Sequence, residues 1–209
     1  MMPGRSGTVP TALEAWVSAT HRVRSVRTAS TALGCDALAC SAYKWFGPHV
    51  GIQWARPELL AELTPDKLRP SPDVPPHRWE NGTPPFEALA GVAAAADYTR
   101  GMDWDAVRAH EEHLLAGALE GLESLPKVKL HGRARDRTPT LMFTVERRTS
   151  AEVAKALAER HVAVWDGNYY AWELERFLGL APHGAVRAGF VHYNDERDVE
   201  RLLDAVEAL

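Results

Sequence analysis

The last third of the chain alternates short apolar runs with amphipathic helical segments, and this rhythm restricts the fold more than any other feature. The pattern indicates strands at 140–145, 162–165 and 185–192, and helices at 150–160, 170–178 and 196–208. Apolar residues recur at helical spacing in the last helix, so one of its faces packs while the other meets solvent. Strands that alternate with helices form a sheet with helices on one side. We therefore expect residues 127–209 to form a small α+β domain.

The chain before residue 127 follows a different pattern. A short apolar run at 37–40 is typical of a buried strand, and an alternating run at 50–54 indicates a second strand. Further expected elements are a short helix at 56–63, a proline-rich loop at 70–85, and helices at 85–99 and 104–125, the last capped by Asp103. The whole chain is thus expected to be of the α/β class.

Three segments contain residues that could carry chemistry. In the first, Lys44 directly follows the apolar run and precedes Gly47-Pro48. A lysine just beyond a buried strand is desolvated, which lowers its pKa and favours the neutral amine that forms a Schiff base with an aldehyde. The second segment, 78–83, reads Arg-Trp-Glu-Asn-Gly-Thr, and the third, 184–194, places Arg187 in an otherwise apolar strand and ends in Tyr-Asn.

In this order, the three segments resemble the class V aminotransferases and cysteine desulfurases, enzymes of fold type I that use pyridoxal 5'-phosphate (PLP). The resemblance runs from about Ala32 to the C-terminus. It implies a Schiff base between Lys44 and PLP, with Ser41 binding the cofactor phosphate. Tyr43 stands where most members have a histidine that also contacts the phosphate. A tyrosine there can donate a hydrogen bond but carries no positive charge.

The resemblance also assigns roles to the other two segments. Gly82 and Thr83 match a loop that, in a homodimer, reaches the cofactor phosphate of the partner subunit. Arg187 matches the arginine that binds the α-carboxylate of an amino-acid substrate, and the planar guanidinium suits a carboxylate because it makes two parallel charge-assisted bonds. A structural ion pair is the alternative for Arg187, since an arginine in an apolar strand is costly unless it is paired.

The segment of the desulfurases that carries the catalytic cysteine matches residues 164–171, where Tyr170 stands at the cysteine position. A phenol cannot accept a sulfur atom as a persulfide, so cysteine desulfurase activity is not expected. Tyr169 and Tyr170 are instead expected to shape a substrate pocket or simply to pack, and Asn168 is assigned to the same pocket. The two cysteines, Cys35 and Cys40, flank the lysine strand, where burial would make them inert.

The chain also looks incomplete beside this family, whose full-length members are about twice as long. No Asp precedes Asp36, although family members have one there that pairs with the pyridine nitrogen. We therefore expect an atypical, poorly ordered stretch at 1–31, the C-terminal part of the PLP-binding large domain at 32–126, and the small domain at 127–209. The expected function is a truncated PLP enzyme acting on an amino acid. A catalytically inactive remnant, or half of a split enzyme completed by an N-terminal half chain, remains the alternative.

Composition removes other classes of function. The net charge of −4 gives no reason to expect a nucleic-acid partner, and no apolar run approaches the ~20 residues of a membrane helix. His110 and His113 lie three residues apart on a helix, whereas zinc-binding helices of metalloproteases space them by four, so no metal site is expected. Two cysteines without CxxC spacing favour a reducing cytoplasm.

Overall fold

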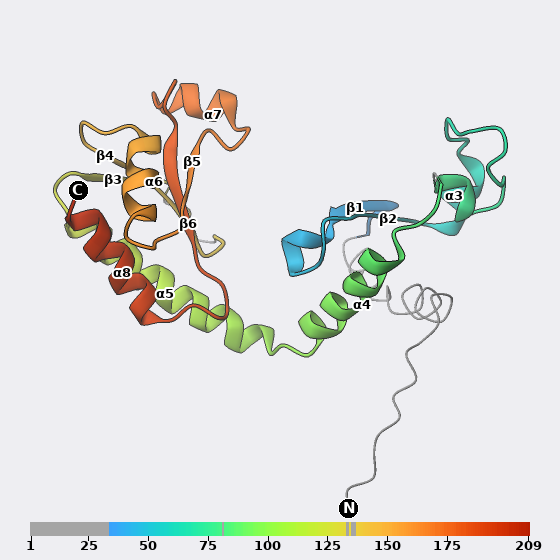
Figure 1. Ribbon diagram of the computed structural model, residues 1–209, viewed down its shortest axis with the longest axis horizontal. Helices are drawn as coiled ribbons and strands as arrows, with labels where there is room; N and C mark the ends of the chain where they lie inside the picture. The colour runs from blue at the N-terminus through green and yellow to red at the C-terminus, as the bar shows by residue number, and fades with distance from the viewer. Residues whose placement is uncertain (1–33, 81, 133, 135–136) are drawn as a thin grey trace, which may run out of the picture. The chain divides into compact units, whose positions relative to one another are not determined.

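The computed structural model describes residues 34–80, 82–132, 134 and 137–209 (Figure 1). Contacts divide the chain into two compact units, Met1–Met102 and Asp103–Leu209. The boundary expected between residues 126 and 127 stays a prediction, and the helix at 104–124 belongs to the second unit. The expectation of a poorly ordered start at 1–31 falls outside the described residues.

The first unit contains a small hairpin and short helices. Its elements are β1 (Ala37–Ser41), the 3₁₀-helix η1 (Ala42–Trp45), β2 (Gly51–Ala55), α3 (Pro57–Glu62), the 3₁₀-helix η2 (His77–Trp79) and α4 (Phe86–Arg100). β1 and β2 pair antiparallel, from Ala37 opposite Ala55 to Ser41 opposite Gly51. The connection between them is tight at Gly47, whose backbone N–H donates to the Ala42 carbonyl oxygen over 2.9 Å. A Cβ on Gly47 would lie 2.9 Å from the Cβ of Ala42, so only glycine fits this turn.

The strand expected at 37–41 is present, but it is not buried. Ala37 and Ala39 are exposed, and Cys40 is only half-buried. β1 and β2 form a two-stranded sheet, so β1 has a strand neighbour on one edge only. The expectations of a buried strand and of a desolvated lysine after it are therefore wrong for this chain, because Lys44 is exposed as well.

The second unit is a layer of helices on one face of an antiparallel sheet (Figure 1). Its elements are α5 (Trp104–Ser124), β3 (Val128–His131), β4 (Thr140–Val145), α6 (Ser150–Ala158), β5 (Trp165–Gly167), α7 (Trp172–Phe177), β6 (Ala185–Gly189) and α8 (Glu196–Glu207). The strand order is β3-β4-β6-β5. The core lies between the sheet and α5, α6 and α8, and its largest fully buried side chain is that of Phe143 on β4.

Alternation along the strands defines the two faces of this sheet. On β4, Leu141, Phe143 and Val145 are buried, while the residues between them are half-exposed. On β6, Val186 and Ala188 are buried and Arg187 is exposed. Successive side chains of a strand point to opposite faces, so Arg187 lies on the outer face, away from the three helices.

Side-chain caps fix where the helices of the second unit begin. The Asp103 carboxylate accepts hydrogen bonds from the backbone N–H groups of Asp105 and Ala106, as expected for the N-cap of α5. Thr149 and Glu152 form a capping box at the start of α6. None of the described helices is long and apolar enough to cross a membrane.

Candidate functional site

The turn that contains Lys44 also contains two other expected residues: Tyr43 lies with Lys44 on η1, and Ser41 directly precedes this 3₁₀-helix. Ser41 is the N-cap residue of η1, with an extended backbone, and its hydroxyl makes no capping hydrogen bond. Lys44 lies in the last turn of the same 3₁₀-helix. The Ala42 N–H donates to the Val50 carbonyl over 3.0 Å, which ties the turn to the start of β2. An amine and a hydroxyl that does not cap the helix therefore lie three residues apart on a turn fixed by its backbone.

Tyr43 has a partner that the sequence analysis missed. Its ring stacks on the imidazole of His49, with centroids 5.1 Å apart and planes inclined by 27°. The tight turn at Gly47 returns the chain so that His49 lies over η1. Half of the Tyr43 surface is exposed. The pair places a titratable imidazole beside the position where the family has a histidine, and only the closeness of Gly47-Pro48-His49 to Lys44 in sequence could have hinted at it.

The loop of Gly82 and Thr83 lies in the first unit and is held at its start. Arg78 donates to the Ala61 carbonyl over 3.1 Å, and the Trp79 indole donates to the Leu60 carbonyl over 3.1 Å, so η2 is fixed against α3. Gly82 has a positive φ of 75°, a conformation that favours glycine. Thr83 is exposed. A glycine with a left-handed backbone and an exposed threonine therefore follow an anchored segment.

In the second unit, Arg187 lies on β6 between strands on both sides. Trp165 on β5 and Met142 on β4 are its partners in register. Its guanidinium carbon lies 4.7 Å from the ring centroid of Tyr169, a cation–π distance. Within the described part of the chain, no carboxylate lies within ion-pair distance of Arg187, so the alternative of a structural ion pair has no support there.

The hydroxyl of Tyr169 donates to backbone carbonyl oxygens. It lies 2.9 Å from the Trp165 carbonyl oxygen and is also within hydrogen-bond distance of the Ala185 carbonyl oxygen. Burial raises the pKa of Tyr169 to about 12, an effect larger than the opposing one of the Arg187 charge, while Asp166 adds to the increase. Tyr169 is therefore a neutral donor at physiological pH that lies across β5 and β6.

Asn168 and Tyr170, the two residues assigned to a substrate pocket, form a local turn. The Asn168 side-chain oxygen accepts from the Tyr170 N–H over 3.1 Å. Tyr169 and Tyr170 both have positive φ, 55° and 62°. The Asn168 oxygen thus stabilises an uncommon backbone conformation, and the Tyr170 side chain is fully exposed. The turn brings Tyr169 against Arg187 and directs Tyr170 into solvent.

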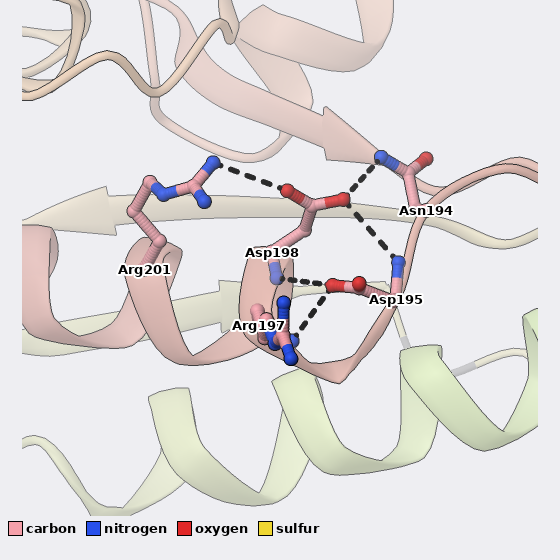
Figure 2. Close-up of polar contacts among 5 residues, drawn as sticks. All are labelled: Asn194, Asp195, Arg197, Asp198 and Arg201. Atoms are coloured by element: carbon pink, nitrogen blue, oxygen red, sulfur yellow. Dashed lines mark hydrogen bonds and ion pairs between the residues drawn. The ribbon is translucent and has the colours of Figure 1, made fainter.

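The segment after β6 that ends in Tyr-Asn is held by the start of α8 (Figure 2). The Asn194 amide donates to Asp198 over 2.9 Å, and Asn194 accepts from the Val191 N–H over 2.9 Å. Asp195 caps α8 by accepting from the Arg197 and Asp198 N–H groups. The hydrogen bond from Asn194 is the main reason why the pKa of Asp198 lies below its usual value. Asn194 therefore organises the backbone here.

The two histidines weighed as metal ligands have protein partners. His110 is hydrogen-bonded through Nε2 to the Asn194 carbonyl oxygen over 2.8 Å. The Nε2 atom of His113 lies 3.5 Å from a carboxylate oxygen of Glu196. Among the residues that the structure describes, no group of three or more His, Cys, Asp or Glu side chains could hold a metal ion.

Comparison with known proteins decides the family. The model of the aminotransferase class-V family matches residues 16–202, which is most of the chain. The chain belongs to the class V aminotransferase family. The match begins well before Ala32, so the expectation that the first 31 residues are unlike the family is wrong from residue 16 onward.

Several members of this family can be compared with the chain directly. A probable cysteine desulfurase of Pseudomonas putida is 34% identical over 191 residues, which are 84% of this chain and 46% of the relative. The apo structure of a cysteine desulfurase of Thermococcus onnurineus has a TM-score of 0.78 at 27% identity, and the match covers 86% of this chain and 48% of the other. The expected fold type is thereby confirmed. The chain spans about half the length of the curated relatives that it matches.

A more distant solved structure shares the fold and carries the cofactor. It is a variant of C-DES with glycine covalently linked to PLP, with a TM-score of 0.65, 20% identity, and coverage of 85% of this chain and 47% of its own. In this chain, the turn of Lys44 offers an exposed amine and a Ser41 hydroxyl that does not cap the helix, groups of the kind that suit an aldehyde and a phosphate.

Proposed function

We propose that this chain binds PLP through a Schiff base to Lys44 and acts on an amino acid. The observation that carries the proposal is the single turn, fixed by the Ala42–Val50 and Gly47–Ala42 backbone hydrogen bonds, that presents Ser41, Tyr43 and Lys44 together. When bound, PLP supplies an electron sink that stabilises negative charge on the carbon beside the substrate nitrogen. Everything else in the proposal concerns the side chains of this chain.

At the cofactor end, Ser41 and Tyr43 are proposed to donate hydrogen bonds to the phosphate, since both hydroxyls can serve as donors to an anion. Gly82 and Thr83 are proposed to serve the same phosphate of a second subunit in a homodimer. The exposure of Thr83 and the permissive backbone at Gly82 support that role, and the family resemblance supplies the dimer.

At the substrate end, Arg187 is proposed to bind the α-carboxylate, and Lys44 to move a proton at the substrate α-carbon. Asn168 and Tyr170 are proposed to border the same pocket. Tyr170 cannot serve as a sulfur acceptor, so the reaction proposed is transamination, elimination or a lyase step other than cysteine desulfuration. Two cysteines without CxxC spacing suit a reducing cytoplasm.

A second candidate is half of a split enzyme, completed by a partner chain. One structural observation favours it: β1 and β2 form a two-stranded sheet, and Ala37 and Ala39 of β1 are exposed. Strand edges and apolar surface of this kind are suited to pairing with further strands. A catalytically inactive remnant would show the same surface but bind neither partner nor cofactor.

The test is to add PLP to the purified full chain and record its visible absorbance. A Schiff-base band near roughly 420 nm is expected. Borohydride reduction should then fix the cofactor to the peptide that contains Lys44. The band should vanish in Lys44→Ala and persist in Lys129→Ala, which removes an exposed lysine of the other unit.

The outcomes separate the candidates. A folded chain that gives no band contradicts PLP binding by this polypeptide alone. Recovery of the band after co-expression with the N-terminal half of a relative would establish the split enzyme. A band that survives in Lys44→Ala would refute the assignment of the lysine.

A further inference from the structure

The outer face of the second unit carries Arg187 in a row with side chains to which the family resemblance gives no role. Arg187 is directly opposite Trp165 on one side and Met142 on the other. Directly opposed residues on neighbouring antiparallel strands have Cβ atoms about 5 Å apart and project from the same face. Trp165 is 65% exposed. An exposed guanidinium is therefore flanked by a large exposed indole and a thioether on the face that the helices leave open.

Tyr169 limits where this guanidinium can lie. The Tyr169 hydroxyl lies within hydrogen-bond distance of carbonyl oxygens of both β5 and β6, at Trp165 and Ala185, and shares its single proton between them. Its ring is thereby held beside the two strands that carry Trp165 and Arg187. The guanidinium carbon of Arg187 lies over this ring, 4.7 Å from its centroid. A guanidinium has five N–H donors, so a ring on one side of it leaves donors available for a ligand. With no acid at ion-pair distance in the described residues, those donors face solvent.

We infer that Arg187, Tyr169 and Trp165 form a preformed receptor for a carboxylate that bears an apolar or aromatic group. Arg187 binds the carboxylate through its paired N–H groups, and Trp165 supplies an apolar surface for the group beside it. Tyr169 is a positioning residue, because it acts on the ligand only through Arg187. The inference rests on the proposed function in one respect, that the bound carboxylate belongs to the substrate. The substrate class is then an amino acid with a large apolar side chain.

The neighbour of Arg187 on β5 supports an apolar ligand side chain. Trp165 lies directly opposite Arg187 and is uncharged, so an aromatic ring beside the bound carboxylate would gain contact with its indole. A second carboxylate in that place would gain no ion pair from Trp165. Ring pairs contribute about 0.5–1.5 kcal/mol beyond their buried area. That corresponds to a preference of roughly 2- to 12-fold for the aromatic ligand.

The experiment measures binding of two carboxylates to the full chain without PLP, by ligand-observed NMR titration. The probes are propionate and 3-phenylpropionate, which differ only by the ring. Wild type is expected to bind 3-phenylpropionate about 3- to 10-fold more tightly. Trp165→Ala should bring the two affinities within about twofold of each other and leave that of propionate unchanged. Trp165 is mostly exposed, so its removal should leave the fold intact.

Variants of the other two residues complete the test. Arg187→Gln should lose both ligands, whereas Arg197→Gln, which removes an exposed arginine of α8, should bind both as wild type does. Tyr169→Phe, which keeps the ring but loses its strand anchor, should weaken both ligands by the same factor and leave their ratio unchanged. Equal binding of the two probes by wild type, or an unchanged ratio in Trp165→Ala, would overturn the inference. Because PLP is absent, these results do not depend on whether Lys44 binds the cofactor.

Discussion

A methyl group added at Gly184 should weaken the pairing of β5, the edge strand that carries Trp165, with β6. Gly184 is buried directly before β6 and has a φ of 64°. A Cβ there would overlap the carbonyl group of Gly167 and lie 2.7 Å from its Cα. Those atoms are backbone and cannot rotate away, so Gly184→Ala must push β5 from β6. Gly179→Ala is the matched control, because Gly179 has a φ of 70° but nothing within 4 Å of the added Cβ.

The difference between the two variants can be estimated. Each places alanine in a left-handed conformation, at a cost of roughly 1–2 kcal/mol, partly offset by about 0.4–1 kcal/mol of entropy lost from the unfolded chain. Gly184→Ala also weakens the pairing of β5, including the hydrogen bonds of Tyr169 to both strands. Two or three such bonds at about 1 kcal/mol each bring its total to about 3–4 kcal/mol, against about 1 kcal/mol for Gly179→Ala.

Urea denaturation followed by circular dichroism gives the free energy of unfolding of the two variants. Amide hydrogen exchange should show that protection is lost first at 165–167 and 185–187 in Gly184→Ala. Equal losses of stability in the two variants would refute the reasoning, because they would mean that the close approach to Gly167 costs nothing. Loss of protection elsewhere but not in β5 would refute it as well.

Two further predictions concern the same unit. Phe143→Ala removes the largest fully buried side chain of the core and should lower the free energy of unfolding by about 3–5 kcal/mol. Tyr170→Ala, at a fully exposed position, should change it by less than about 0.5 kcal/mol. Comparable losses of the two variants in urea denaturation would contradict the assigned core. Burial raises the pKa of Tyr169 to about 12 in the folded state, so its contribution to the free energy of unfolding is present below about pH 10 and is lost as the pH rises towards 12. The free energy of unfolding of Tyr169→Phe should therefore fall less steeply than that of wild type between about pH 10 and 12. Parallel curves of unfolding free energy against pH would show that the phenol is not buried.

Local sequence signals predicted most of the elements. The helix at 104–125 with Asp103 as its cap was expected because the apolar stripe and the capping residue agree, and the structure has it at Trp104–Ser124. The strand at 140–145 was expected with its bounds correct. The family segments were also recognisable, since each depends on a few residues close together in the chain.

Features that depend on other parts of the chain were missed. β3 at Val128–His131 is only four residues long and gave too short a run to recognise. The strand expected at 162–165 is instead Trp165–Gly167, because pairing with β6 rather than hydrophobicity decides its place. The burial expected for Lys44 depended on layers that cover β1, and a strand pattern does not say which layers are present. Tyr169 was noted only as a pocket or packing residue, because its contact with Arg187 depends on a left-handed turn.

The hydrogen bonds of Asn194 affect how mutations in this family should be interpreted. Asn194 belongs to a motif that marks the family, yet its side chain is committed to Val191 and Asp198, and its carbonyl oxygen to His110 on α5. Loss of activity after substitution of this asparagine would ordinarily be attributed to a lost ligand contact. In this chain its first effect would be to release the beginning of α8 from the loop that follows Arg187. A family signature can thus mark a residue that holds the backbone behind a binding site.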